Sequence, residues 1–236
     1  PMLTDARCVP VATPWSADPV VVQHGRIEGH DLLFLARHGD AHRVPPHRIN
    51  YRANVWALRA QGADDVLAVA AVGGIRGHPP GSLSLPTQLI DYTSGRDATF
   101  FDGGDAPVTH VDFTWPYSPA LRAACLDAAS HAGVALHDGG VYAAVNGPRL
   151  ETAADIDRLE RDGATMVGMT GMPEASLARE AGLNYAVVAL CINAGAGRGD
   201  SIDGISQPSL EAALQSGMRE VCLLLRQVAL DRKDKR

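Results

Sequence analysis

The sequence predicts an α/β fold, in which helices cover a central β-sheet, and two observations support this. Short apolar runs bounded by Gly, Pro or Asp recur along the 236 residues, and those at 65–73 and 184–192 are apolar on both faces, as strands covered on both sides are. Helical patterns alternate with these runs. No Pro/Gly/Ser-rich linker divides the chain, so residues 1–236 are expected to form one domain.

The elements follow from local patterns. Helix 118–133 has Ser118 as its N-cap, Pro119 at its first position and Gly133 after its last turn. The long segment 77–119 is rich in Gly, Pro and aromatic residues and is expected to be a loop. Strands are expected at 31–36, 65–73, 140–145, 165–169 and 184–192, and helices at 49–62, 118–133, 151–163, from Pro173 onward, and at 209–229.

Composition and charge exclude several classes of function. The net charge is −6 and the only basic cluster is at 232–236, so nucleic acid is not an expected partner. No apolar run is long enough to span a membrane, so a membrane is not an expected partner of the protein. The four cysteines lie far apart without metal-ligand spacing, so no metal site is predicted and reduced thiols of a cytoplasmic protein are expected.

Ligands of α/β proteins bind at the carboxyl ends of strands, where this chain places several polar groups. Arg37 and His38 follow the run at 31–36 and suit phosphate oxygens, although a strand-end ion pair has the same pattern. Backbone N–H groups near Ala71 can cradle an anion, although a tight turn needs the same glycines. The segment 70–77 lacks the GxGxxG and GxxxxGK[ST] patterns, so it predicts neither a dinucleotide site nor a P-loop.

Two further strand ends carry candidates. Met169 and Thr170 lie between a strand and a helix, where a hydroxyl and helix N–H groups favour an anion and Met offers an apolar surface. Asn193 closes the strand at 184–192 and can both donate and accept. Each also has a structural interpretation as a gap-filling or capping residue, and Glu151 can equally be a first-turn helix charge.

Taken together, these segments resemble the purine nucleoside phosphorylase and methylthioadenosine phosphorylase family. The resemblance covers most of the chain and is most specific in RHG…HRINYRANVWAL and GMTGMPEASLARE, with further support from QLIDYTSGRDATFF and NGPRLETAADI. It implies an α/β three-layer sandwich around a distorted mixed sheet, a homotrimer, and phosphorolysis of a purine nucleoside without a metal or organic cofactor, with inorganic phosphate as co-substrate.

The resemblance also implies roles for individual residues. Arg37, His38, Thr170 and the backbone at Ala71 would hold phosphate. Met169 would lie under the ribose, and Leu150 and Glu151 would flank the purine. His110 would reach the 5′ substituent from a neighbouring subunit. Catalysis would depend on Asn193, Thr170 and His38, and Ile205 and Leu210 are candidates for an apolar 5′ pocket.

The base site departs from the methylthioadenosine enzymes, which carry an Asp-x-Asp pattern where this chain has Asn193 and Gly195. An ionised Glu151 only accepts hydrogen bonds, so it pairs with N1–H of hypoxanthine but opposes the N1 lone pair of adenine. Mismatches of this kind discriminate by about 10⁴-fold in a buried site. The methylthio-type body with an oxopurine-type base site favours 5′-methylthioinosine as the substrate.

The family's initial Gly-Gly-Thr-Gly loop has no counterpart in this sequence, which we expect to begin downstream of it. The alternatives are a methylthioadenosine phosphorylase, a general inosine/guanosine phosphorylase, and a nucleoside-binding protein without catalytic activity.

Overall fold

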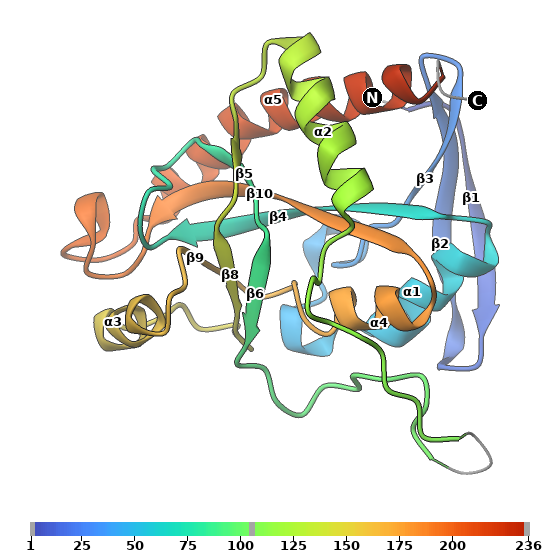
Figure 1. Ribbon diagram of the computed structural model, residues 1–236, viewed down its shortest axis with the longest axis horizontal. Coiled ribbons are helices and arrows are strands. Elements are labelled where there is room, and N and C mark those ends of the chain that lie inside the picture. The colour runs from blue at the N-terminus through green and yellow to red at the C-terminus, as the bar shows by residue number, and fades with distance from the viewer. Residues whose placement is uncertain (1–2, 104–106, 234–236) are drawn as a thin grey trace.

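The computed structural model describes residues 3–103 and 107–233. The last three residues of the basic cluster at 232–236 lie outside these ranges. Within them, a seven-stranded central sheet and a three-stranded sheet are present, with helices packed around the larger one (Figure 1).

The central sheet is mixed. Its strand order is β6 (Gln88–Asp91), β8 (Val141–Ala144), β9 (Met166–Gly168), β4 (Asp65–Gly74), β10 (Asn184–Ala194), β5 (Leu83–Leu85) and β7 (Leu136–Asp138). β10 pairs in parallel with β4, as do β8 with β9, β6 with β8, and β5 with β7, whereas the pairs β4/β9 and β10/β5 are antiparallel.

β10 shows why its sequence is apolar on both faces. Tyr185 and Val187 point into a core shared with α1 (Tyr51–Ala60) and α4 (Glu174–Glu180). Val188 and Leu190 point into a second core formed with α2 (Pro119–Ala132) and α5 (Gln207–Lys233). Successive side chains of a strand alternate between faces, so both faces must be apolar when helices cover both. The expected α/β fold with a mixed sheet between helices is confirmed.

The predicted helices are present, with boundaries set by their caps. The Ser118 hydroxyl accepts the Leu121 N–H at 3.3 Å, and Gly133 ends α2 with φ of 66°. α3 (Ala153–Arg161) packs on β8 and β9, and Thr152 and Asp155 form a capping box at its start. Short 3-10 helices occur at Asp40–His42, Pro46–Arg48 and Gly199–Ser201.

The strand expected at 31–36 is present but lies in a different sheet. β3 (His30–Phe34) joins β1 (Thr4–Thr13) and β2 (Ser16–Ile27) in an antiparallel sheet. This sheet packs only one face against α1, through residues such as Val22, so Phe34 on the other face is 46% exposed. The sequence predicted the strand but not its sheet, because an apolar run does not show how many of its faces are covered.

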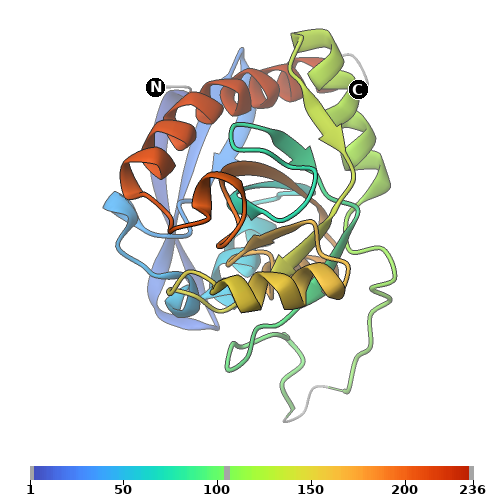
Figure 2. The ribbon, with the colours of Figure 1, turned by 90° about the vertical axis from the view of Figure 1, so that its left-hand side faces the viewer.

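The segment expected as a loop at 77–119 contains the short strands β5 and β6. Beyond β6, residues 92–103 and 107–118 contain no helix or strand, and this part of the chain extends away from the body (Figure 2). Across residues 3–103 and 107–233, no helix is long and apolar enough to cross a membrane, and no three His, Cys, Asp or Glu side chains are grouped to hold a metal ion.

Candidate active site

A cavity of about 2550 Å³ opens beside β4. β4 pairs with β10 along its whole length but with β9 only at Gly73 and Gly74, so the rest of its outer edge faces this space. β3 and α5 contribute other walls. The cavity lining includes Arg37, His38, Ala71, Leu150, Glu151, Met169, Thr170 and Asn193.

The sheet topology explains why residues so far apart in sequence meet. β10 is parallel to β4, which places Asn193 opposite Gly73. β8 is parallel to β9, with Ala144 opposite Gly168, so the chain segments after these two strands leave the sheet at the same edge. β9 is antiparallel to β4, so the chain beyond Gly168 returns along β4 toward Ala71.

Asn193 is held at an irregular strand end. The register between β10 and β4 shifts between Cys191 and Asn193, which marks a bulge, and bulges re-aim side chains. The Asn193 Nδ2 donates to the Ala194 carbonyl at 2.6 Å. A Cβ at Gly73 would lie 3.4 Å from this nitrogen, so a larger side chain at Gly73 would crowd the amide. Among the residues that the structure describes, no other group binds this amide, so one N–H and the Oδ1 of Asn193 are available to a ligand.

Glu151 lies half-buried in the cavity wall, just before α3. Burial raises the pKa of its carboxyl group, with a smaller contribution from Asp155 in the same direction. Arg149 lowers this pKa only weakly, because its guanidinium is paired with Asp155 at 2.8 Å. A hydrogen bond from its own backbone N–H lowers this pKa in part. Glu151 forms no ion pair within the described ranges, and its carboxylate keeps further lone pairs that can accept a hydrogen bond from a ligand.

Met169 and Thr170 lie in the tight turn between β9 and α4. The buried Tyr142 supports this turn from below: its hydroxyl accepts the Thr170 N–H at 3.4 Å. A Cβ at Gly171 would lie 2.8 Å from the Tyr142 ring, and one at Gly147 would overlap the Met169 sulfur. The turn therefore depends on glycines on both sides, and it packs against the segment that leads to Glu151.

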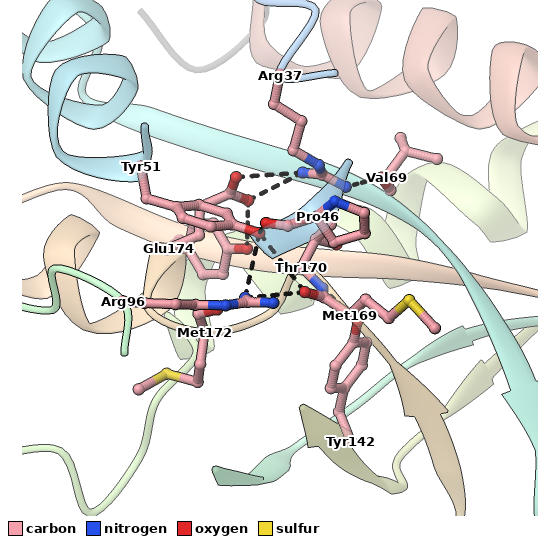
Figure 3. A network of polar contacts seen from close by, with 11 residues as sticks. Arg37, Pro46, Tyr51, Val69, Arg96, Tyr142, Met169, Thr170, Met172 and Glu174 are labelled. Atoms are coloured by element: carbon pink, nitrogen blue, oxygen red, sulfur yellow. Dashed lines mark hydrogen bonds and ion pairs between the residues drawn. The ribbon is translucent and has the colours of Figure 1, made fainter. Parts of the chain in front are cut away.

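Arg37 lines the cavity, but its guanidinium is paired within the protein. Its Nη1 donates to Glu174 Oε1 at 3.0 Å and Oε2 at 3.3 Å, and its Nη2 donates to the Val69 carbonyl (Figure 3). The Tyr185 hydroxyl also donates to Glu174, at 2.8 Å. The Arg37 and Glu174 side chains are only 14% and 10% exposed, so an anion at Arg37 has to compete with a buried carboxylate.

The hydrogen bonding of His38 fixes its tautomer. Its Nδ1 lies 2.8 Å from the Val44 carbonyl, which can only accept, so Nδ1 carries the proton. Burial lowers the pKa of the imidazole, so the ring is neutral at pH 7 and its Nε2 presents a lone pair. The ring stacks on His42, with centroids 4.2 Å apart.

Comparison with known proteins identifies the family. The model of the phosphorylase superfamily matches residues 9–227. The chain belongs to the phosphorylase superfamily. It is 51% identical to a probable S-methyl-5′-thioinosine phosphorylase of Pseudomonas syringae, over 94% of this chain and 90% of that protein.

Other relatives agree with this membership. The chain is 46% identical to a probable 6-oxopurine nucleoside phosphorylase of Thermococcus kodakarensis, over 83% of this chain and 75% of the other. The crystal structure of a methylthioadenosine phosphorylase from an antarctic soil metagenomic library superposes with a TM-score of 0.91 at 30% identity, covering all of this chain and 83% of that one.

Three other residues predicted for the site of this superfamily member differ in their position relative to the cavity. His110 is exposed on the extended loop and does not line the cavity of its own chain. Leu210, at the start of α5, does line the cavity, whereas Ile205 is half-buried outside it. Of the two residues predicted for an apolar 5′ pocket, Leu210 is therefore the one that lines the cavity.

Several polar residues for which the sequence predicted no role form hydrogen bonds around this superfamily member's candidate site. They contact the predicted residues from elements distant in sequence, so no local pattern reveals them. In the sequence, these residues are distinguished by lying in or beside the motifs that carry the family resemblance. They are Tyr51, Arg96, Tyr142 and Glu174.

Proposed function

We propose that this protein cleaves 6-oxopurine nucleosides by phosphorolysis, and that its preferred substrate is 5′-methylthioinosine. The products are hypoxanthine and 5-methylthioribose 1-phosphate. The observation that carries the proposal is that Glu151 and Asn193 line the same cavity.

Base selection follows from hydrogen-bonding chemistry. A 6-oxopurine has a donor at N1 and an acceptor at O6, and adenine reverses both. A carboxylate at Glu151 accepts from N1–H, and the free N–H of Asn193 donates to N7 or O6. An adenine at the same place would leave its N1 lone pair against a carboxylate, an unpaired contact that costs about 1–3 kcal/mol or more.

Gly195 supports the same choice. Its N–H donates to the Gly74 carbonyl at 2.6 Å, and a Cβ there would lie 3.2 Å from that carbonyl and from Ile156 Cδ1. Gly195 is absent from the cavity lining. Neither position of the Asp-x-Asp pattern of the methylthioadenosine enzymes is a carboxylate here, because Asn193 and Gly195 occupy them.

Phosphate binds at the other part of the proposed site. Thr170 offers its hydroxyl, Ala71 its backbone, and His38 a neutral Nε2 that accepts a hydrogen bond from a protonated phosphate oxygen. Arg37 exchanges Glu174 for the phosphate, since a guanidinium fork binds either anion in two-point fashion.

The mechanism separates charge along the glycosidic bond. As this bond breaks, the sugar becomes oxocarbenium-like and the purine becomes negative. The Asn193 N–H stabilises charge that is present mainly in the transition state, which is the kind of contact that raises kcat. Phosphate then attacks the anomeric carbon above Met169. The reaction uses no cofactor beyond its co-substrate phosphate.

We further propose that the protein is a homotrimer located in the cytoplasm. The loop that carries His110 also exposes two large apolar side chains, Val108 and Trp115, at 82% and 61%, and a subunit interface would cover them. In a trimer, the partner subunit's His110 would reach the 5′ substituent. Light scattering coupled to size-exclusion chromatography tests this: a trimer mass is expected, and a monomer would refute it. The four free cysteines favour a reducing compartment.

The reaction class is tested by following ³¹P NMR signals while the protein acts on methylthioinosine and inorganic phosphate. We expect a sugar 1-phosphate to form in equal amount to hypoxanthine, and no base release without phosphate. A protein that binds methylthioinosine but forms neither product would be the non-catalytic nucleoside-binding alternative.

A further inference from the structure

The peptide group that joins Met169 to Thr170 is held at both ends. Its carbonyl oxygen accepts from Arg96 Nη1 at 2.9 Å, and its N–H donates to the Tyr142 hydroxyl at 3.4 Å (Figure 3). A peptide group bound from both sides keeps one orientation. The directions of the Met169 and Thr170 side chains therefore depend on Arg96 and Tyr142.

The same guanidinium reaches the base side of the cavity. Arg96 Nη2 donates to the Asn146 carbonyl at 3.0 Å and to the Val145 carbonyl at 3.4 Å. These residues follow β8 and lead directly into the segment that carries Glu151. Arg96 Nη1 also donates to the Met172 carbonyl, at the far end of the turn. One side chain thus joins the turn with Met169 and Thr170 to the segment with Glu151.

A third connection runs through Tyr51. Arg96 Nη1 donates to the Tyr51 hydroxyl at 3.2 Å, and this hydroxyl donates to the Pro46 carbonyl at 3.0 Å. The Arg96 guanidinium carbon lies 5.3 Å from the centroid of the Tyr51 ring. Pro46 follows the segment of Arg37 and His38 and lines the cavity with them. The network therefore spans the three segments that carry the proposed phosphate, ribose and base residues.

Arg96 is also unusual in its charge balance. All its hydrogen-bond acceptors in the described ranges are neutral: backbone carbonyls and one phenol. Asp97, the next residue in sequence, is paired with Arg52 at 2.6 Å, and Glu174 is paired with Arg37 at 3.0 Å. A planar fork with five N–H donors can serve two separate pairs of carbonyls, whereas the ammonium group of a lysine acts as a point charge.

We infer that Arg96 is a positioning residue for the proposed phosphorolysis, with Tyr142 as its counterpart beneath the turn. It sets the phosphate and ribose residues relative to the base residues and acts through Met169, Thr170 and Glu151. This inference rests on the proposed function for its kinetic consequences, but its structural part, an ordered phosphate site, can be measured without turnover.

The test compares Arg96→Ala and Tyr142→Phe with a matched control, Arg122→Ala. Arg122 is also a half-buried arginine that donates to backbone carbonyls, those of Leu85 and Pro86. It differs from Arg96 in pairing with a carboxylate, Asp138, and none of these partners belongs to the proposed site. Displacing reacting groups by about 1 Å can cost about 100-fold in rate, so Arg96→Ala is expected to lower kcat by about that factor. It should also raise KM for both phosphate and nucleoside, because Arg96 contacts both segments.

The other variants separate positioning from stability. Tyr142→Phe should raise KM for phosphate and leave KM for the nucleoside near its wild-type value, because it loosens only the turn. Arg122→Ala should lower Tm and leave both KM values near wild type. Millimolar guanidinium chloride should restore part of kcat in Arg96→Ala and none in Arg122→Ala. Unchanged KM values in Arg96→Ala with a lowered Tm and no rescue would overturn the inference.

If Arg96→Ala does not fold, Arg96→Lys decides, since it keeps the charge but loses the fork: raised KM values for both substrates support the inference, and wild-type values overturn it. If wild-type protein cleaves no purine nucleoside, the proposed function fails. The rise in Tm with inorganic phosphate then tests Arg96 alone, because a ligand that binds the folded state raises Tm. Loss of this rise in Arg96→Lys supports the inference, and its retention overturns it.

Discussion

Replacing the Glu151 carboxylate with the amide of glutamine should relax base selection. Hydrogen bonds to charged groups contribute about 1.5–3 kcal/mol and neutral ones about 0.5–1.5 kcal/mol, so Glu151→Gln should weaken the contact with hypoxanthine N1–H by about 1 to 1.5 kcal/mol. For adenine, the glutamine N–H removes an unpaired contact of about 2 kcal/mol. Together these changes amount to roughly 3 to 3.5 kcal/mol, or roughly 150- to 400-fold in the preference for the oxopurine.

The assay is kcat/KM for methylthioinosine and methylthioadenosine at saturating phosphate, in wild type and Glu151→Gln. Glu180→Gln is the control, since Glu180 is also half-buried but contacts Thr99 and Phe100 outside the cavity. The ratio of the two kcat/KM values should fall in Glu151→Gln and stay constant in Glu180→Gln. An unchanged ratio in a folded Glu151→Gln protein would refute the assignment of Glu151 to base N1.

Three other predictions follow from the site. Asn193→Ala should lower kcat on methylthioinosine by about 10²-fold or more, the effect of losing one transition-state donor, and near-normal turnover would contradict this role. Burial raises the pKa of Glu151, so kcat/KM for methylthioinosine should fall as the pH falls through that raised pKa, and Glu151→Gln should abolish this acid limb. Burial lowers the pKa of His38 from 6.5, so the unfolded chain binds the proton more readily and stability should fall below about pH 6.5. His38→Gln should flatten that decline in a plot of Tm against pH, and an identical slope would contradict it.

The sequence predicted best those features that local patterns encode. β10 and α2 were predicted from burial on both faces and from capping at Ser118 and Gly133, and both are present. Thr170 and Asn193 could be predicted to lie close together, because ligand sites of α/β folds form at the carboxyl ends of the strands. Both residues line one cavity. The functional roles of these residues remain proposals.

Other features depend on contacts between distant segments. β5, β6 and β7 are three or four residues long, too short for a periodic pattern to be recognised. The β1–β2 hairpin contains Pro10 and Pro19 and leaves one face largely exposed, which weakens the strand signal. The partners of Arg37 and Arg96 lie up to 137 residues away in sequence, so their pairing follows only from the folded chain.

The central claim is tested most directly by the specificity of the wild-type protein. kcat/KM should be measured with methylthioinosine, methylthioadenosine and inosine at the same phosphate concentration, with release of the free base as the readout. We expect methylthioinosine to give the highest value and methylthioadenosine a value lower by about 10⁴-fold. An equal or higher kcat/KM for methylthioadenosine would contradict the roles given to Glu151 and Asn193.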